Sequence, residues 1–329
     1  MIFYITSFVI INLLIYIKRE FLIRKYNIYD VPDKERKKHK IKVSVFGGAI
    51  IQINLLFLLI FILVFDIEFP KFIENNRNLF SIFLTSFLIF LVGLFDDMLL
   101  IRNRAKFLAL LLVVLLASSI DNDIHITSLK FSWINRDILL LDFSIFFTLL
   151  CILSFMNSFN FLDGIDLLCG TYALGIFMIF FYLTKSIIFL PIIFSLILFC
   201  FLNYKKLIFF GDSGALLISF LISIFMIKIY KLNLIYTEQI LILLLIPIVD
   251  NLRVFFIRFI NKYSILKPDN NHLHHLLNKK FNSLNTVLII IAPIFLPFIF
   301  TLFNKEFFYI LIFFQIMFYL SLIINLKKL

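Results

Sequence analysis

The chain has 329 residues, of which 62% are hydrophobic and 46 are phenylalanine. An ordinary soluble domain is only about half apolar, so this composition excludes a soluble globular protein. The formal net charge of +11 does not by itself indicate a nucleic-acid partner, because an excess of lysine and arginine is typical of the cytoplasmic loops of membrane proteins.

Apolar stretches recur along the whole chain, most of them long enough to cross a bilayer as a helix. No ten-residue alternation of polar and apolar residues suggests a β-barrel. We therefore predict an all-α, polytopic integral membrane protein that forms a single integral membrane domain over 1–329. The eleven predicted spans are 1–17, 46–65, 79–95, 106–120, 143–159, 167–184, 187–203, 213–230, 239–258, 284–303 and 307–325.

Lysine and arginine are concentrated in alternate connections between these spans. The positive-inside rule then predicts that the N-terminus lies outside and the C-terminus in the cytoplasm. With this orientation, five polar segments meet on the cytoplasmic side of the membrane. These segments are 31–48, 95–106, 157–166, 204–214 and 253–283. Such convergence predicts a site assembled from several loops at a membrane surface.

Two acidic residues, Asp96 and Asp97, close the third span, and Lys106 follows at the start of the next. Adjacent carboxylates at a membrane boundary can bind a divalent cation, whereas a lysine there can meet an anionic headgroup. Two solvated charges at a helix end and a simple interface anchor are the alternatives.

The segment "NSFNFLDGID" carries two asparagines and two aspartates between two apolar runs. Asn157, Asn160 and Asp163 are three residues apart, so a helix end would bring them to roughly one face, and Asp166 continues the series. Amide and carboxylate oxygens without nearby cysteine suit a hard cation such as Mg²⁺ together with substrate hydroxyls. Polar pairing between helices is the alternative.

Three further segments complete the set. In "FFGDSG", Asp212 lies directly before a span, where backbone amides favour a phosphate and the carboxylate can hold a metal. Taken alone, this motif is better interpreted as a helix cap. In "HLHH", His272 and His275 share a helical face and His274 is expected to point elsewhere, which argues against zinc and for imidazole donors to a pyrophosphate. The basic run around Lys37 and His39 would by default bind anionic lipid.

Together, these motifs make phosphate chemistry on a nucleotide plausible, while no P-loop or GxGxxG motif supports an ATPase or a dehydrogenase. The ordered motifs "DKERKKH", "LVGLFDD", "NSFNFLDGID", "GDSG" and "PIVDNLRVFFIRF…PDNNHLHHLL" resemble those of the polyprenyl-phosphate N-acetylhexosamine-1-phosphate transferases, glycosyltransferase family 4. The resemblance covers roughly residues 30–280. The "HLHH" form is similar to the branch that initiates O-antigen, enterobacterial common antigen and teichoic-acid linkage units.

The resemblance implies a reaction in the bacterial inner (cytoplasmic) membrane. UDP-HexNAc, by default UDP-GlcNAc, and undecaprenyl phosphate would give undecaprenyl-pyrophosphoryl-HexNAc and UMP with Mg²⁺, or alternatively Mn²⁺. By motif, Asp212 and Asn160 would be metal ligands, and Asp96 would be the catalytic base with Asp97 supporting it. The remaining residues would bind substrate or phosphate: Lys37, His39, Lys106, Asn157, Asp163, Asp166, His272, His274 and His275.

The chain departs from the family pattern at a few positions. The family usually has Gly where this chain has Leu167, and commonly Ser where it has Ala215. A peptidoglycan-precursor transferase that uses UDP-MurNAc-pentapeptide and a membrane transporter or flippase are the alternative functions. The sequence leaves open the donor sugar, the polysaccharide, direct displacement against an aspartyl-phosphate intermediate, and a homodimer. No nucleic-acid partner is expected.

Overall fold

The computed structural model describes residues 1–26, 29–30, 43–65, 70–99, 101–134, 136–262, 271–304 and 307–327. Within these ranges the α-helices are α1 (Ile2–Tyr26), α2 (Gly47–Phe65), α3 (Asn76–Leu99), α4 (Asn103–Ile120), α5 (Ser144–Leu162), α6 (Leu168–Thr184), α7 (Leu190–Tyr204), α8 (Gly211–Lys231), α9 (Thr237–Ile260), α10 (Leu273–Asn278), α11 (Ser283–Phe303) and α12 (Phe308–Lys327). Three 3-10 turns are η1 (Asn122–Ile124), η2 (Leu141–Phe143) and η3 (Ile187–Phe189).

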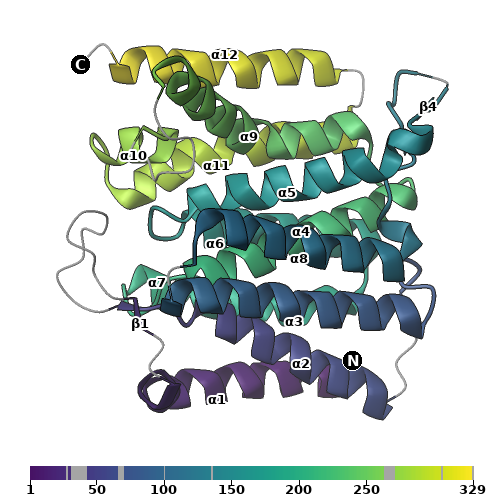
Figure 1. Ribbon diagram of the computed structural model, residues 1–329, viewed down its shortest axis with the longest axis vertical. Helices are drawn as coiled ribbons and strands as arrows, with labels where there is room; N and C mark the ends of the chain where they lie inside the picture. Colours follow the sequence, from purple (N-terminus) through teal and green to yellow (C-terminus); the bar gives the residue numbers. More distant parts are fainter. Residues whose placement is uncertain are drawn as a thin grey trace.

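Two short antiparallel hairpins connect some of the helices. Strand β1 (Tyr29–Asp30) pairs with β2 (Val43–Ser44), with Tyr29 opposite Ser44. Strand β3 (Ser128–Leu129) pairs with β4 (Ile138–Leu139), with Ser128 opposite Leu139. The two hairpins lie at opposite ends of the helical bundle, β1 at the left and β4 at the right of Figure 1.

The all-α, polytopic architecture is confirmed. Each predicted span overlaps one described α-helix, and the six-residue helix α10 is the additional one. Ten of the described helices are long and apolar enough to cross a membrane, and α6, with 17 residues, is a shorter apolar helix. The helices lie side by side, so that their ends form two opposite faces of the molecule (Figure 1).

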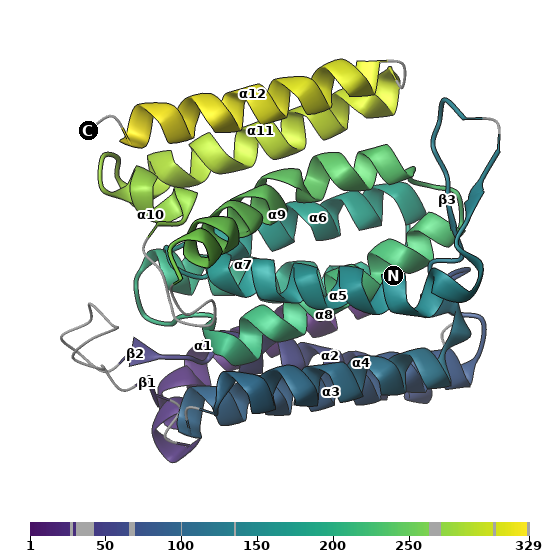
Figure 2. The same cartoon turned by 45° about the horizontal axis from the view of Figure 1, so that its top comes forward.

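Helix α8 forms the centre of the bundle. All of its residues from Ser213 to Tyr230 are buried, and it packs against α2, α3, α5 and α6 (Figure 2). The outermost helices behave differently: only 22% of the apolar window of α1 and 17% of that of α12 are buried. Exposure of so much apolar surface to water would be unfavourable. We therefore infer that these exposed faces contact lipid.

Small residues allow neighbouring helices to approach the start of α8. A Cβ atom on Gly93 of α3 would overlap the backbone of Ser213, and one on Gly48 of α2 would lie 2.6 Å from the amide nitrogen of Gly214. Any larger residue at these positions would push α2 or α3 away from α8. The glycines therefore bring the end of α3 close to the "GDSG" motif.

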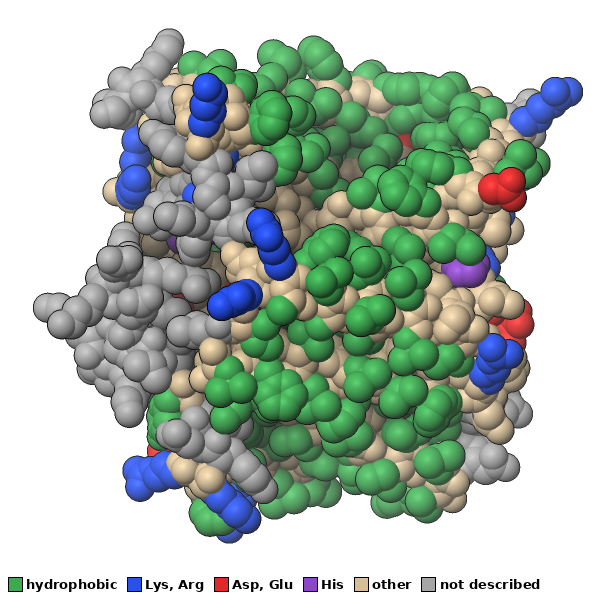
Figure 3. Space-filling view, in the orientation of Figure 1, with side chains coloured by type: hydrophobic (Ala, Val, Ile, Leu, Met, Phe, Trp, Pro, Cys, Tyr) green, Lys and Arg blue, Asp and Glu red, His purple; other side chains and the backbone are tan. Residues whose placement is uncertain are grey.

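Charged side chains lie toward the two ends of the bundle and hydrophobic ones across its middle (Figure 3). At the end away from "GDSG", Lys228 of α8 forms an ion pair with Asp121, with 2.6 Å between Nζ and Oδ2 and side-chain exposures of 1% and 0%. One turn further along α8, Lys231 approaches Asp123 at 3.5 Å, with both side chains 30% exposed. These contacts tie the end of α8 to the turn after α4.

Candidate functional site

The polar motifs gather at one end of the bundle. This end is formed by the C-terminal ends of α3 and α5, the N-terminal ends of α4 and α8, and the short helix α10 (Figure 2). The described part of segment 31–48 lies beside them, because Phe209 donates its amide hydrogen to Ser44 O at 2.7 Å and Gly47 donates to Phe209 O at 3.0 Å. Lys37 and His39 lie outside the described residues. Four motifs that are far apart in sequence, and the flank of the fifth, thus meet here.

A lysine lies between two carboxylates in the middle of this site. The Nζ atom of Lys106 is 2.8 Å from Oδ2 of Asp96 and 3.0 Å from Oδ1 of Asp212. All three side chains are mostly buried, with exposures of 14%, 11% and 23%. Buried carboxylates need such compensation, because their uncompensated charge is costly away from water. Lys106 therefore joins α3, α4 and α8 through charge.

The two adjacent aspartates of α3 have different partners. Asp97 accepts hydrogen bonds from the amide groups of Asp212 at 2.8 Å and Ser213 at 3.0 Å. These amides belong to the first turn of α8, where free N–H groups and the helix dipole favour a negative charge. Asp96 instead contacts Lys106. Helix α3 continues to Leu99, so the two side chains are consecutive on a helix and point in different directions.

The end of α5 brings amide and carboxyl oxygens to Asp212. The side chain of Asn160 contacts the Asp212 carboxylate, and the carboxyl group of Asp163 accepts a hydrogen bond from the backbone of Gly211. Burial raises the pKa of Asp163 well above its ordinary value, and the charges of Asp212 and Asp97 raise it further. Asn157 is exposed one turn earlier on α5, and Asp166 is half-buried in the turn before α6.

One departure from the family pattern, Leu167, lies in a strained turn after α5. Leu167 has φ +71° and ψ −21°, in the left-handed region where glycine carries no steric cost. Its amide nitrogen donates to the Asn203 side chain at 2.6 Å. The backbone here adopts the conformation that a glycine would take freely, and the leucine adopts it at a cost of about 1–2 kcal/mol.

The imidazoles of "HLHH" pack against this same turn. A Cβ atom on Gly164 would lie 2.8 Å from Nε2 of His274 and 2.7 Å from Cε1 of His275. The rings of His272 and His274 are stacked, with centroids 5.6 Å apart, and His274 and His275 are 4.2 Å apart. The prediction that His274 points away from the other two is wrong, because His272 precedes α10 as its N-cap and does not follow the helical spacing.

His274 is the most enclosed of the three imidazoles. It is 1% exposed, and neither of its ring nitrogens has a hydrogen-bond partner among the described residues. Burial lowers the pKa of His274 well below its ordinary value, and His275 and His272 lower it further. A buried polar ring without a partner costs free energy, so this neutral imidazole is available to bond a ligand.

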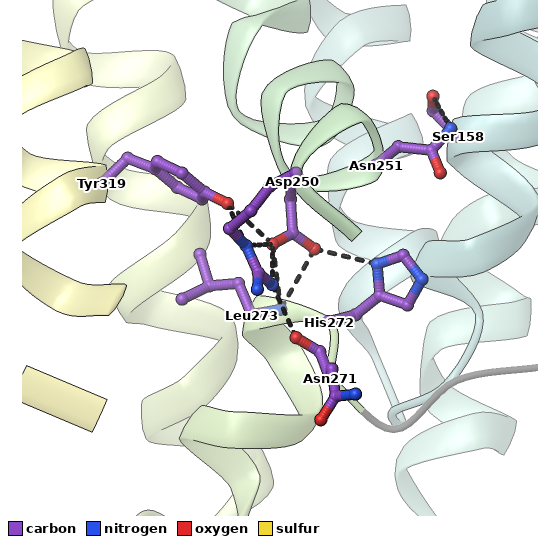
Figure 4. A network of polar contacts seen from close by, with 8 residues as sticks. Ser158, Asp250, Asn251, Asn271, His272, Leu273 and Tyr319 are labelled. Atoms are coloured by element: carbon purple, nitrogen blue, oxygen red, sulfur yellow. Dashed lines mark hydrogen bonds and ion pairs between the residues drawn. The ribbon is translucent and has the colours of Figure 1, made fainter. Parts of the chain in front are cut away.

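A network around Asp250 was not identified as part of the site from the sequence (Figure 4). Asp250 is 3% exposed and accepts hydrogen bonds from Arg253, from the Tyr319 hydroxyl and from the amide of Leu273. Oδ2 of Asp250 is also 3.0 Å from Nδ1 of His272. The available signal was a carboxylate within an apolar span, which is itself unusual.

The oxygen atoms near Lys106 are suited to a hard cation. Among the described residues, no group of three or more His, Cys, Asp and Glu side chains is arranged as a metal site. Mg²⁺, however, is commonly bound by one or two carboxylates and keeps several waters. Asp212 with Asn160 against it, and Asp96 across the Lys106 ammonium group, match that donor set, and the position already favours a cation.

Comparison with known proteins adds an independent finding. Residues 79–230 match the model of glycosyl transferase family 4. The chain is similar to a probable undecaprenyl-phosphate N-acetylglucosaminyl 1-phosphate transferase of Bacillus subtilis, with 28% identity over 62% of this chain and 59% of that protein. It is also similar to the undecaprenyl-phosphate alpha-N-acetylglucosaminyl 1-phosphate transferases of Salmonella typhi (25% identity) and Escherichia coli O157:H7 (24%). The match covers 83% of this chain in both cases, and 74% and 75% of those proteins.

Proposed function

We propose that the protein transfers a sugar 1-phosphate onto a polyprenyl phosphate, because residues 79–230 match the model of glycosyl transferase family 4 and the motifs predict the same reaction. The acceptor is undecaprenyl phosphate, and the donor is a UDP-N-acetylhexosamine, by default UDP-GlcNAc. The products are undecaprenyl-pyrophosphoryl-HexNAc and UMP. The names of the relatives support the acceptor and the transferred group.

The observation that carries this proposal is the contact of Lys106 with both Asp96 and Asp212. A cation held between carboxylates, at the same end of the bundle as a buried imidazole whose nitrogens have no partner among the described residues, would provide charge and hydrogen bonds for phosphates. Both substrates of the proposed reaction are anions. Phosphoryl transfer between anions depends mainly on positioning and on neutralising their repulsion.

We assign Mg²⁺ to the oxygen atoms of Asp212 and Asn160, with Mn²⁺ as an alternative. When bound, the metal ion would neutralise negative charge on the donor pyrophosphate. Asp97 holds the first turn of α8 through its two amide contacts and thereby fixes the position of Asp212. We further propose that Asn157, near the end of α5, and Asp163 and Asp166, in the turn that follows α5, bind the nucleotide sugar.

The proposed reaction is a direct displacement. An oxygen of the lipid phosphate attacks the β-phosphorus of the UDP-sugar, a new phosphorus–oxygen bond forms, and the bond from that phosphorus to the bridging oxygen breaks. The bonding electrons leave with that oxygen on UMP. A phosphate monoester is already mostly ionised at neutral pH, so a base at Asp96 has little proton to remove. A covalent route through Asp96 would require its carboxylate to leave Lys106.

We place the reaction in the inner (cytoplasmic) membrane of a bacterium, as the first membrane step of a surface polysaccharide. The apolar helices and the bacterial relatives support a multi-pass membrane protein. In this placement, the end of the bundle with the site faces the cytoplasm, where UDP-sugars are found.

The test is an assay on purified protein in detergent with undecaprenyl phosphate, Mg²⁺ and a panel of UDP-sugars. The panel includes several UDP-HexNAc donors and UDP-MurNAc-pentapeptide, and Asp212→Asn serves as the control variant. UMP and lipid-linked sugar should appear together, only with acceptor and metal, and not with the variant.

The outcomes separate the candidate functions. Turnover with a UDP-HexNAc supports the proposal and identifies the sugar, and turnover only with UDP-MurNAc-pentapeptide would assign the peptidoglycan branch. If folded protein turns over no donor, the transferase proposal fails and transport of a lipid or ion becomes the hypothesis to test.

A further inference from the structure

Asp250 occupies an unusual position for a carboxylate, because it lies within the apolar helix α9 and is almost fully buried. Its oxygens contact groups from three elements. Arg253 Nη2 donates to Oδ1 at 2.8 Å, the Tyr319 hydroxyl of α12 donates to Oδ1 at 2.9 Å, and the Leu273 amide donates to Oδ2 at 3.0 Å. An isolated carboxylate in this position would be very costly, whereas this one is fully hydrogen-bonded.

The cluster is rigid because its members also hold one another. Arg253 Nε donates to the Tyr319 hydroxyl at 2.7 Å, and its Nη2 donates to the backbone oxygen of Asn271 at 2.5 Å. Asn271 directly precedes His272. The cluster therefore fixes the backbone on both sides of His272, through Asn271 and Leu273, as well as its ring (Figure 4).

His272 links the cluster to the candidate site. Its Nδ1 atom is 3.0 Å from Oδ2 of Asp250, and its second ring nitrogen points away from Asp250 (Figure 4). The ring stacks on Phe161 of α5 with centroids 5.1 Å apart, and on His274. Phe161 directly follows Asn160, so the imidazole lies against the segment that is proposed to bind the nucleotide sugar.

We propose that Asp250, held by Arg253 and Tyr319, is a positioning residue for His272. Asp250 accepts the Nδ1 hydrogen and so fixes which ring nitrogen carries it, and Nε2 is left as the atom that contacts the UDP-sugar. A carboxylate that orients a histidine in this way sets both the tautomer and the direction of the ring. Helix α12, which is otherwise peripheral, thereby contributes to the site through Tyr319. This assignment rests on the proposed transferase function.

The substitution Asp250→Asn tests the proposal. The amide can donate to Nδ1 where the carboxylate could only accept, which favours the other tautomer. We expect kcat/KM for the UDP-sugar to fall by about tenfold to a hundredfold, in line with the loss of similar outer partners of a ligand-binding histidine. KM for the UDP-sugar should rise, and KM for undecaprenyl phosphate should stay the same.

Two further variants keep the test informative if Asp250→Asn folds poorly. Tyr319→Phe removes one hydroxyl without changing the ring, so we expect the same change in KM at a smaller, few-fold size. Ser158→Ala is the matched control. Ser158 accepts a hydrogen bond at 2.9 Å from Asn251, which follows Asp250 in the chain. This bond also joins α5 to α9, but it does not involve His272. KM should not change in this control.

Action through His272 is tested by a double-mutant cycle. In a His272→Gln background, adding Asp250→Asn should have almost no further effect on KM. An equally large effect in both backgrounds would overturn the proposal, as would Asp250→Asn protein that only loses active fraction and keeps its KM.

A spectroscopic measurement separates this proposal from the transferase assignment. In protein with ¹⁵N-labelled histidine, assigned by comparison with His272→Gln, the wild-type His272 should carry its hydrogen on Nδ1, and Asp250→Asn should shift that population. This readout needs no turnover. If the wild type is inactive with every donor but shows the Nδ1 tautomer, the proposed function fails while the positioning holds. If His272 carries its hydrogen on Nε2 in the wild type, the positioning proposal fails.

Discussion

The ion pair between Lys228 and Asp121 gives a sharp prediction about stability. The two side chains are 1% and 0% exposed, and apart from this ion pair Nζ and Oδ2 have no hydrogen-bond partner among the described residues. Removal of one member leaves the other as a buried, uncompensated charge, which typically costs about 3–5 kcal/mol. We therefore expect Lys228→Met to lower the free energy of unfolding by roughly that amount.

The chain provides a matched control in the same helix. Lys231 approaches Asp123 at 3.5 Å, and both side chains are 30% exposed. Solvent screens such a pair, so Lys231→Met should cost less than about 1 kcal/mol. Both substitutions remove one positive charge from α8, so the two lysines differ only in their burial and in the distance to their partners.

The assay is reversible unfolding by denaturant in detergent micelles, followed by tryptophan fluorescence. Trp133 is the single tryptophan of the chain, and it stacks on Phe308 near the same end of the bundle. The double variant Lys228→Met with Asp121→Asn should recover part of the loss, because no unpaired charge remains. Equal losses for Lys228→Met and Lys231→Met, or a loss below 1 kcal/mol for Lys228→Met, would refute the reasoning.

Three further predictions concern the site. Lys106→Met should lower kcat by about 10²- to 10³-fold by removing a preorganised charge, while Lys106→Arg should retain more activity; equal rates for the two variants in the UMP-release assay would contradict this. Because the pKa of His274 is lowered in the folded state, the unfolded chain binds more protons below about pH 6.5, so stability should fall as the pH drops from 7 to 5. In thermal unfolding, His274→Gln should lose less stability over this pH range than the wild type. Equal losses of stability in the two proteins would contradict this prediction. At Leu167, with φ +71°, Leu167→Ile should leave the protein less stable than Leu167→Gly, since a β-branched residue is poorly tolerated there and glycine is not strained. Denaturant unfolding that ranks the two variants the other way would exclude strain at this turn.

The positions of the membrane helices could be predicted from hydropathy because each helix must present an apolar surface over the thickness of the bilayer. Helix ends were harder to predict. The apolar signal ends before the charges, whereas the backbone hydrogen bonds continue, so α1 extends to Tyr26 and α3 to Leu99, which places Asp96 and Asp97 inside a helix. Because Asp96 and Asp97 are consecutive residues of a helix, their carboxylates point in different directions.

The grouping of the site motifs at one end of the bundle followed from the alternation of charged connections. The individual contacts could not be predicted, because they depend on packing between distant segments. Asp250 contacts Tyr319, 69 residues away, and Lys228 pairs with a residue more than 100 positions earlier. The orientation of His274 was predicted wrongly for a local reason, since helical spacing was applied to His272 before the helix begins.

The central position of α8 connects these observations. Its first turn carries Asp212 and is held by Asp97 of α3, its middle is buried against four helices, and its last turn carries Lys228 and Lys231. A polar group at either end can be kept only where another helix compensates its charge. Each compensating partner in turn fixes that helix relative to α8. The residues proposed to bind phosphates therefore also hold the bundle together at this end, so their substitution should be tested with a stability measurement beside every activity measurement.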